Sequence, residues 1–404
     1  MSVTKQAYED KKLNVYIPQL ERLDDRLDMF MEEDQRQFFI VRAHRYGVPI
    51  YEYCNGLSTN DYGIKQDSIS CVFSITKPVA AVLIMKLQED GLLDISDPMG
   101  RYFECFQGEG KSEMCVWHFM THTSGIVEEK FEKFKNDYVQ KEYGLSRGEN
   151  ISNEEYEEFE KKLNEKMGLN ENANYDERNL IFLKKFKPEK GPGQVMSYCN
   201  LGYRFLGKLV QKISGMSIEE YGRKVLFDPL GMVDSHFILP HEKWHRVAGR
   251  NEKCVDYQYV NSENCFTNDR ASGGLKSTVI DMCRFGDMLL GEGTLDGVRI
   301  LSPASVREMS KNHNYMLSEN DPWSSWGLGF NLRSTKKDDA GVLRSACSLE
   351  HGGACGHKFL ADPEYGVSIS IFTGEYDSPV FTADHVEVKN IYYAINNMII
   401  AAMN

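Results

Sequence analysis

Ser74 and Lys77 stand three residues apart in "CVFSITKPVAAVLIM", residues 71–85, just before a run of apolar residues. A serine hydroxyl attacks a carbonyl carbon efficiently only when a neighbouring base takes its proton, and a neutral lysine amine can be that base. On a helix, a spacing of three places both side chains on one face within contact distance. Burial disfavours the ammonium form of a lysine. The stretch therefore predicts a nucleophile that carries its own base.

The S-x-x-K spacing alone does not single out this pair. It occurs twice more, as Ser2/Lys5 in "SVTK" and as Ser334/Lys337 in "STKK". Polar "QAYEDKK" follows the first and the turn-like "DDAG" follows the second, so we expect both lysines to stay hydrated and charged. Only Ser74 precedes an apolar helix. Because proline is tolerated only in the first helical turn, Pro78 predicts a helix that starts near Ser74, with Gly91 at its C-terminal cap.

The stretch "GLSRG", Gly144–Gly148, matches the G-x-S-x-G pattern of a nucleophile elbow. Such an elbow needs a buried strand before the serine and a helix after it. The flanking "KNDYVQKEY" and "ENISNEEY" are polar and helix-like or loop-like. We therefore expect no nucleophile elbow at this position.

The stretch "HEKWH", His241–His245, matches H-E-x-x-H. On one helix, His241 and His245 would share a face and bind zinc, with Glu242 as general base. Pro240 and the following "RVAGR" leave barely two turns, and nothing marks a third ligand. We expect an exposed polar turn, and a zinc peptidase stays open as an alternative.

The remaining elements are predicted from hydrophobic periodicity and turn residues. We expect an amphipathic helix at 16–34, a hairpin at 37–47 and 48–56, helices at 200–214 and 217–227, strands at 326–333, 358–366 and 367–375, and a helix at 388–403. Residues 127–190 are rich in charge and predict a solvated helical insertion, either a lid over a site or a surface excursion.

Strands near both ends with helices between them predict an α+β fold. In it, an antiparallel sheet flanked by helices is built from both chain termini, with a mainly helical lobe inserted. We expect the sheet lobe to comprise 16–73 and 268–404. The helical lobe would comprise 74–267 and include the charged insertion.

Composition and charge exclude several classes of partner. The formal net charge of −13 over 404 residues comes with no Lys/Arg block, which argues against nucleic-acid binding. The N-terminus lacks the apolar core of a signal peptide, and no apolar stretch is long enough to span a bilayer. The ten cysteines are scattered without a C-x-x-C pair, which is typical of reduced thiols. We expect a cytoplasmic protein without membrane contact.

Three motifs follow one another in a fixed order: Ser74-Ile75-Thr76-Lys77, Tyr198-Cys199-Asn200 and His351-Gly352-Gly353. They resemble the S-x-x-K, Y-x-N and K/H-x-G elements of the serine β-lactamase-like superfamily, most closely its class C and D-aminopeptidase or esterase branch. The resemblance implies that the α+β fold is β-lactamase/transpeptidase-like. Y-x-N recurs at 53–55 and 259–261. Only Tyr198 follows "KGPGQVMS" and precedes a helix-like "LGYRFLGKLV". The resemblance covers roughly residues 35–126 and 190–375.

The resemblance implies a role for each catalytic residue. Ser74 would attack a carbonyl carbon and form an acyl-enzyme, while Lys77 and Tyr198 would share the proton transfers. The backbone N–H groups of Ser74 and Ala354 would form an oxyanion hole, the latter on an edge strand. Asn200 would hydrogen-bond Lys77 or the acyl side chain of the substrate. Which of Lys77 and Tyr198 takes the first proton stays open.

The resemblance also assigns His351, Gly352 and Gly353 to substrate binding. The two glycines would allow the substrate to approach the strand closely. His351 stands where β-lactamases of this type carry a lysine that binds the substrate carboxylate. A mostly neutral imidazole holds an anion less well near pH 7.

The sequence thus predicts a serine hydrolase that needs no metal or organic cofactor. Its substrates would be small esters or amides, including D-amino-acid peptides, with weak β-lactamase-like activity at most. Two further alternatives stay open: an acyltransferase of the same fold, and a binding protein that keeps the fold without turnover.

Overall fold

The computed structural model describes residues 2–33, 36–146, 148, 152–335, 340–376 and 386–404. The chain forms two compact units, one made of residues 1–93 and 206–404 and the other of residues 94–205. The lobe boundaries expected at residues 74 and 267 stay a prediction. Arg147 of "GLSRG" and Lys337 of "STKK" lie outside the described residues.

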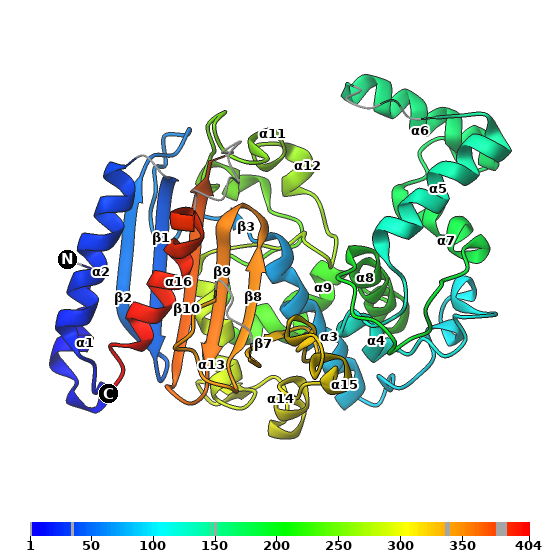
Figure 1. Ribbon diagram of the computed structural model, residues 1–404. Coiled ribbons are helices and arrows are strands. Elements are labelled where there is room, and N and C mark those ends of the chain that lie inside the picture. The colour runs from blue at the N-terminus through cyan, green and yellow to red at the C-terminus, as the bar shows by residue number, and fades with distance from the viewer. Residues whose placement is uncertain (1, 34–35, 147, 149–151, 336–339, 377–385) are drawn as a thin grey trace. The chain divides into compact units, whose positions relative to one another are not determined.

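A six-stranded antiparallel sheet organises the first unit within the described ranges (Figure 1). Its spatial order is β2 (Val48–Gly56), β1 (Arg36–Arg45), β10 (Val367–Glu375), β9 (His357–Asp362), β8 (Leu349–Gly353) and β7 (Asn331–Leu332). Strand β1, near the N-terminus, pairs with β10 near the C-terminus from Arg36↔Glu375 to Arg45↔Val367. The predicted α+β fold with a sheet built from both chain ends is confirmed.

The hairpin of β1 and β2 forms where the sequence places Tyr46-Gly47. Both residues have positive φ, +52° and +78°, as a two-residue hairpin turn requires. Phe39, Val41 and Ala43 alternate along β1 and belong to one buried hydrophobic cluster. This period of two commits one face of β1 to that cluster. The predicted hairpin is confirmed.

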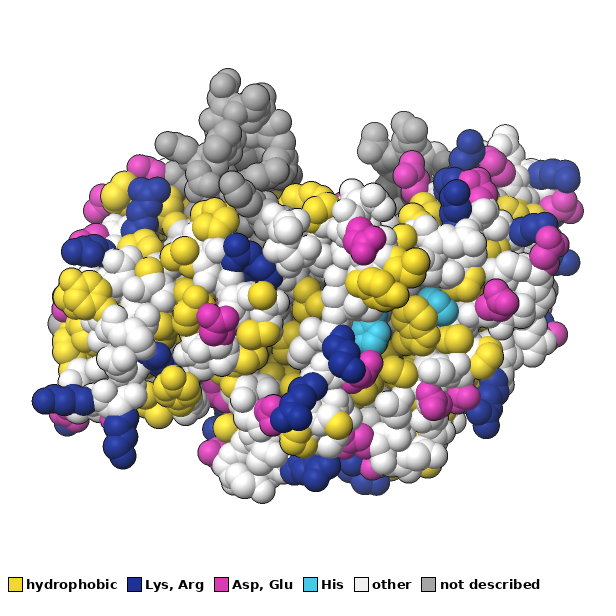
Figure 2. All heavy atoms as spheres, turned by 60° about the horizontal axis from the view of Figure 1, so that its bottom comes forward, with side chains coloured by type: hydrophobic (Ala, Val, Ile, Leu, Met, Phe, Trp, Pro, Cys, Tyr) yellow, Lys and Arg dark blue, Asp and Glu magenta, His cyan; other side chains and the backbone are white. Residues whose placement is uncertain are grey.

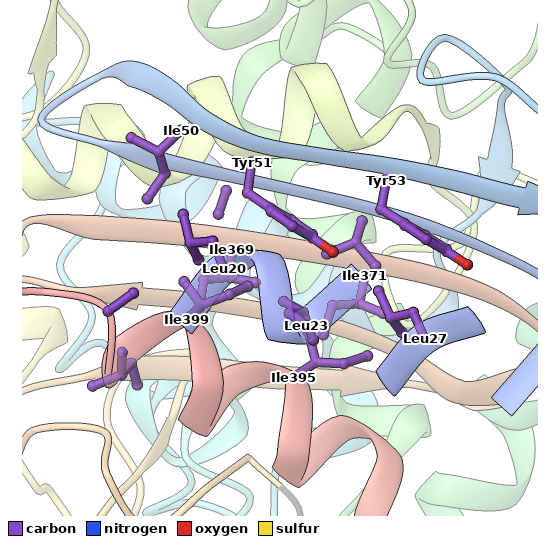
Figure 3. Packing of buried hydrophobic residues seen from close by; sticks show 14 of the residues in the cluster. Leu20, Leu23, Leu27, Ile50, Tyr51, Tyr53, Ile369, Ile371, Ile395 and Ile399 are labelled. Atoms are coloured by element: carbon purple, nitrogen blue, oxygen red, sulfur yellow. The ribbon is translucent and has the colours of Figure 1, made fainter. Parts of the chain in front are cut away.

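One face of the sheet is covered by α2 (Ile17–Glu32) and α16 (Val386–Ile400). Leu20, Leu23 and Leu27 of α2 are fully buried in the cluster. Figure 3 shows these leucines packed between the strands and the isoleucines of α16. The helical spacing of the three leucines predicts this face, and the predicted helix is confirmed.

The opposite face of the sheet packs against α13 (Val279–Leu290) through a buried polar network. His44 of β1 donates from Nδ1 to Asp287 of α13 over 2.6 Å, because its Nε2 already accepts from Arg42. Ser368 of β10 donates to the second oxygen of the same carboxylate over 2.6 Å. The network satisfies polar groups that would otherwise be costly to bury.

The other elements of this unit connect the sheet and its helices. They are α1 (Lys5–Glu9), η1 (Lys11–Leu13), β3 (Ser70–Cys71), η2 (Phe73–Ile75), α3 (Thr76–Glu89), α9 (Ile218–Gly222), η5 (Arg223–Phe227), α10 (Asp228–Leu230), η6 (His241–Arg246), α11 (Tyr257–Val260), α12 (Glu263–Phe266), β4 (Lys276–Ser277), β5 (Thr294–Leu295), β6 (Val298–Arg299), α14 (Pro303–Met309), α15 (Tyr315–Ser318), η7 (Pro322–Ser324) and η8 (Ala354–Gly356). Helix α8 (Asn200–Ser214) starts in the second unit and ends in the first.

The second unit is helical. It contains η3 (Met99–Arg101), η4 (Glu104–Phe106), α4 (Val116–Met120), α5 (Glu128–Tyr143), α6 (Asn153–Met167) and α7 (Tyr175–Lys185). Capping boxes, Ser152 with Glu155 and Asn174 with Glu177, start α6 and α7. The described part of the charged stretch 127–190 is thus mainly helical, in α5, α6 and α7, as predicted. Helices α5 to α7 line a cavity of about 650 Å³ with both charged and aromatic side chains.

Residues 326–333 depart from the prediction of a strand. Only Asn331 and Leu332 pair with β8. A Cβ on Gly327 would lie 2.2 Å from the Met309 carbonyl, and one on Gly329 would lie 2.5 Å from Ala81. Because the backbone passes so close to two helices, this segment bends instead of continuing a ladder.

On the face drawn in Figure 2, Lys and Arg side chains are interspersed with Asp and Glu side chains. Among the described residues, none of the helices has the length and apolar character to cross a bilayer.

Leu23 tests the contribution of α2 to this fold. Leu23→Ala leaves a cavity beneath the helix, and we expect the free energy of unfolding to fall by about 2–5 kcal/mol in urea titrations. Arg22→Ala, on the exposed side of the same helix, is the control and should change it by less than about 0.5 kcal/mol. Equal losses in the two variants would contradict the packing described here.

Candidate active site

Ser74 lies on the short turn η2 between strand β3 and helix α3. Phe73, directly before it, has a φ of +48°, a left-handed conformation that costs a non-glycine residue about 1–2 kcal/mol. The turn is held because Val72 N–H donates to the Leu275 carbonyl over 2.9 Å. Ser74 is half-buried and therefore reachable from outside.

Lys77 points back at this serine from the first turn of α3. Its side chain is fully buried, and Nζ donates to Ser74 Oγ over 2.9 Å and to the Ser272 carbonyl over 2.7 Å. The one-turn spacing in the sequence thus becomes a direct contact, as predicted. The Ser272 carbonyl aims the amine at the hydroxyl.

Thr76 locks the turn that carries the pair. Its hydroxyl donates to the Phe73 carbonyl over 2.5 Å and accepts from Leu275 N–H over 3.0 Å. Thr76 is fully buried, so both bonds are shielded from water. The segment around Leu275, about 200 residues away in sequence, is in this way part of the site.

The end of strand β8 packs against η2. A Cβ on Gly353 would lie 2.4 Å from the Val72 carbonyl, so only glycine allows this approach. Within the described residues, β7 pairs only with Leu349 and Glu350, so the ladder between β7 and β8 ends before Gly352 and Gly353. The edge of these two glycines that faces away from β9 is therefore not paired with β7.

Ala354 differs in one respect from the prediction. It was expected on the edge strand and instead begins the turn η8 after β8. The physical reason lies in the next two residues, since Cys355 and Gly356 have φ of +61° and +83° and cannot continue a strand.

His351 is buried, with 3% of its surface exposed. Its Nδ1 donates to the Gly352 carbonyl over 2.7 Å. Its ring is nearly perpendicular to that of Trp326, with 5.8 Å between the ring centroids. Burial, together with the charge of Lys77, lowers the pKa of His351 to about 3. The imidazole is therefore neutral at pH 7.

Tyr198 and Asn200 belong to the second compact unit. Tyr198 is 38% exposed, and its ring lies on that of His122 at 4.3 Å between centroids. The N–H of Asn200 donates to Glu128 over 2.8 Å. Within the first unit the structure brings Ser74 and Lys77 close to the end of β8.

The competing motifs lack the settings that their chemistry needs. In "GLSRG", helix α5 precedes Gly144 and no strand leads to Ser146 in the described chain. In "HEKWH", His241 and His245 are both exposed on the 3-10 turn η6. No group of three His, Cys, Asp or Glu side chains suited to a metal ion occurs among the described residues.

Sequence reasoning missed the carbonyl of Ser272 and the hydroxyl of Thr76. A backbone acceptor has no side-chain signature. The available signal was "ASGGL", residues 271–275, because Gly273 lies beside the Phe73 backbone and suggests a close approach.

A serine–lysine pair at the start of a buried helix, beside an antiparallel sheet of this topology, defines a serine-reactive α+β protein. The family model described as Beta-lactamase matches residues 45–390. The chain belongs to this family.

Individual relatives include esterases and penicillin-binding proteins. Esterase EstB of Burkholderia gladioli is 22% identical over 377 residues, 87% of this chain and 89% of that protein. Penicillin-binding protein 4 of Amycolatopsis lactamdurans is 34% identical over 150 residues, 35% of this chain and 38% of that protein. The solved structure of EstCE1, a hydrolase with promiscuous acyltransferase activity, matches with a TM-score of 0.70 at 16% sequence identity. The match covers 93% of this chain and 99% of the EstCE1 chain.

Gly353 provides a test of the close approach between β8 and the serine turn. Gly353→Ala drives a methyl group into the Val72 carbonyl, and we expect about 1–3 kcal/mol of lost stability in thermal or urea unfolding. Gly352→Ala is the matched control, because its methyl meets only the end of the flexible Lys358 side chain, at 2.9 Å. Equal stability of the two variants would contradict this packing.

Proposed function

We propose that this protein is a serine hydrolase that acts on small esters or amides through a covalent acyl-enzyme. The observation that carries the proposal is the buried Lys77 amine, 2.9 Å from Ser74 Oγ. Membership of the family and the esterases among the relatives support it. The reaction as proposed uses no metal or organic cofactor, and we propose a cytoplasmic location.

In the proposed acylation step, Ser74 Oγ bonds to the substrate carbonyl carbon and its proton passes to Lys77, which must be neutral to receive it. Tyr198 shares the proton transfers and delivers a proton to the leaving alcohol or amine as the carbonyl–heteroatom bond breaks. The proton that Lys77 received then passes to Tyr198, so both groups return to their starting state. Water next attacks the acyl-enzyme: its oxygen bonds to the acyl carbon, the bond from that carbon to Ser74 Oγ breaks, and one proton of the water passes through the same groups to Ser74 Oγ as the acid leaves. Asn200 would orient Lys77 or the acyl side chain.

The negative charge on the tetrahedral intermediate needs donors fixed before the reaction. We assign this role to the backbone N–H groups of Ser74 and Ala354. The contact of Gly353 with Val72 supports the assignment, since it ties the residues preceding both groups together. One such donor is typically worth about 3 kcal/mol in the transition state.

The neutral, buried His351 bears on substrate choice. An uncharged imidazole adds no positive charge for a substrate carboxylate, so the proposal favours neutral esters and amides over penicillin-like acids. Gly352 and Gly353 would let the substrate lie along their edge of β8. D-amino-acid peptides stay within this substrate class.

Acyl transfer is the second candidate function. EstCE1 is a hydrolase with promiscuous acyltransferase activity, and this chain shares its fold. Only the second nucleophile differs, an alcohol or amine in place of water. A product analysis with added alcohol distinguishes the two outcomes.

Covalent labelling of Ser74 tests the proposed function. A fluorophosphonate should add to Ser74, as detected by mass spectrometry of peptides, and p-nitrophenyl ester hydrolysis should fall by at least about 1000-fold in Ser74→Ala. Ser146→Ala and Ser334→Ala, at two of the other motif serines, are the controls and should label and turn over like the wild type.

Two results would overturn this assignment. If no adduct forms at Ser74 and a chelator abolishes the activity, the result would point to a metal peptidase at His241 and His245. The absence of both labelling and hydrolysis would leave a binding protein that keeps the fold.

His351→Lys tests the proposed recognition of neutral acyl groups. A cation at this position should improve binding of a carboxylate, and a charged hydrogen bond is worth about 1.5–3 kcal/mol. We therefore expect KM for mono-p-nitrophenyl succinate to fall about 10-fold relative to KM for p-nitrophenyl butyrate. His351→Gln, which stays neutral, should leave that ratio unchanged. An unchanged ratio in the lysine variant would place His351 outside the acyl-binding region.

A further inference from the structure

His122 lies in the stretch "MTHTSGI", residues 120–126, beside the candidate proton carrier Tyr198 within the second unit. Its side chain is 2% exposed, whereas that of Tyr198 is 38% exposed. Because the Tyr198 side chain is so exposed, burial does little to hold its phenol in one position. Its position must depend on the contacts that its ring and its backbone make.

Both backbone amides that flank Tyr198 donate to His122. The N–H of Ser197 donates to the His122 carbonyl over 2.8 Å, and the N–H of Cys199 donates to His122 Nδ1 over 3.1 Å. One residue therefore fixes the chain on both sides of the tyrosine Cα. Because an amide N–H can only donate, Nδ1 is the acceptor and does not carry the hydrogen of the neutral ring.

The imidazole ring also packs on the tyrosine ring. The centroids of His122 and Tyr198 are 4.3 Å apart with the ring planes tilted by 30°. The ring of His122 also lies 5.2 Å from that of Tyr203, between centroids, and the Tyr203 hydroxyl donates to the Met120 carbonyl over 2.8 Å. Tyr203 is fully buried and is a fixed neighbour of the imidazole.

The backbone of His122 is held in an unfavourable conformation. Its φ is +60°, in the left-handed region where a non-glycine residue costs about 1–2 kcal/mol, and where Asn and Asp are tolerated best. The neighbouring Thr123 is tied down through its N–H, which donates to the His118 carbonyl, and its own carbonyl, which accepts from Gly193 N–H. Histidine is, like Asn and Asp, one of the non-glycine residues found most often in this region, and these bonds hold the backbone of His122 in it.

We propose that His122 is a positioning residue for the Tyr198 hydroxyl. Its carbonyl and Nδ1 fix the backbone of residues 197–199, and its ring fixes the rotamer of the phenol. This inference rests on the proposed function, in which Tyr198 moves protons. A misplacement of about 1 Å can cost on the order of 100-fold in rate, so this support should appear in kcat.

Two substitutions of His122 separate the acceptor from the ring. His122→Asn keeps an acceptor where Nδ1 stands and tolerates the positive φ, but it loses the ring. His122→Phe keeps a ring and leaves the buried Cys199 N–H without its acceptor. We expect kcat for a p-nitrophenyl ester to fall about 100-fold in His122→Phe with KM little changed, and His122→Asn should recover about 10-fold of that loss.

His118 provides the matched control. It is buried in α4, four residues before His122, and its Nδ1 also accepts from a backbone N–H, that of Cys115, over 2.9 Å. Its ring stacks on Trp117 at 3.8 Å. His118→Asn should keep kcat within about 3-fold of the wild type, since effects on rate are small where no catalytic group is displaced.

A double-mutant cycle with Tyr198→Phe separates positioning from general stabilisation. Without the phenol hydroxyl there is nothing left to position, so His122→Asn should change kcat by less than about 2-fold in the Tyr198→Phe background. Thermal unfolding of every variant shows whether the folded state is retained. Tyr198→Phe itself replaces an exposed side chain and should stay folded.

The outcomes distinguish this inference from the proposed function. Non-additive losses in the cycle, with partial recovery in His122→Asn, support the positioning role. Suppose that the wild type is active. If the losses in kcat from the His122 and Tyr198 substitutions then multiply, or if His122→Phe keeps full kcat, the role of His122 alone is overturned. A wild type with neither ester turnover nor a Ser74 adduct overturns the proposed function, and the positioning role with it.

Discussion

The buried side chain of Lys77 is the constraint on which the site depends. An amine inside a protein must find acceptors for its hydrogens, because an unpaired one costs several kcal/mol. Here the acceptors are Ser74 Oγ at 2.9 Å and the Ser272 carbonyl at 2.7 Å. The serine turn and the segment around Ser272 must therefore lie together. Strand pairing of β3 with β4 and the two bonds to Leu275 hold them there.

This constraint explains why glycines surround the serine–lysine turn. Gly273, Gly329 and Gly353 come from three distant segments, and each brings its backbone against residues 72–81. A Cβ would lie 2.5 Å from Ala81 at Gly329 and 2.4 Å from the Val72 carbonyl at Gly353. Side chains at Gly329 and Gly353 would separate the segments. The close approach leaves backbone groups rather than side chains around Ser74. In the proposed reaction, the N–H groups among them would stabilise the oxyanion.

The sequence predicted what local patterns encode. The leucines of α2, the Tyr46-Gly47 turn and the apolar body of α3 each follow from periodicity or turn chemistry, and they led to Ser74 rather than Ser334. The features that the sequence did not predict arise where segments distant in sequence come close together in the fold. The carbonyl of Ser272 carries no side-chain signal, and residues 326–333 resemble a strand until Gly327 and Gly329 meet two helices. His122 drew no attention because its role lies in backbone bonds and a positive φ.

In the proposed reaction, the two proton carriers differ in their contact with water, and this difference suits two tasks. Lys77 is fully buried and its amine contacts Ser74 Oγ directly, so its task in this reaction is a proton transfer with Ser74 that does not involve solvent. Tyr198 is 38% exposed and can exchange protons with a leaving group that departs into solvent. Exposure, however, removes the packing that would hold a phenol in place. A buried neighbour must then fix the position of the phenol. In this proposal His122 does so by holding the chain on both sides of Tyr198.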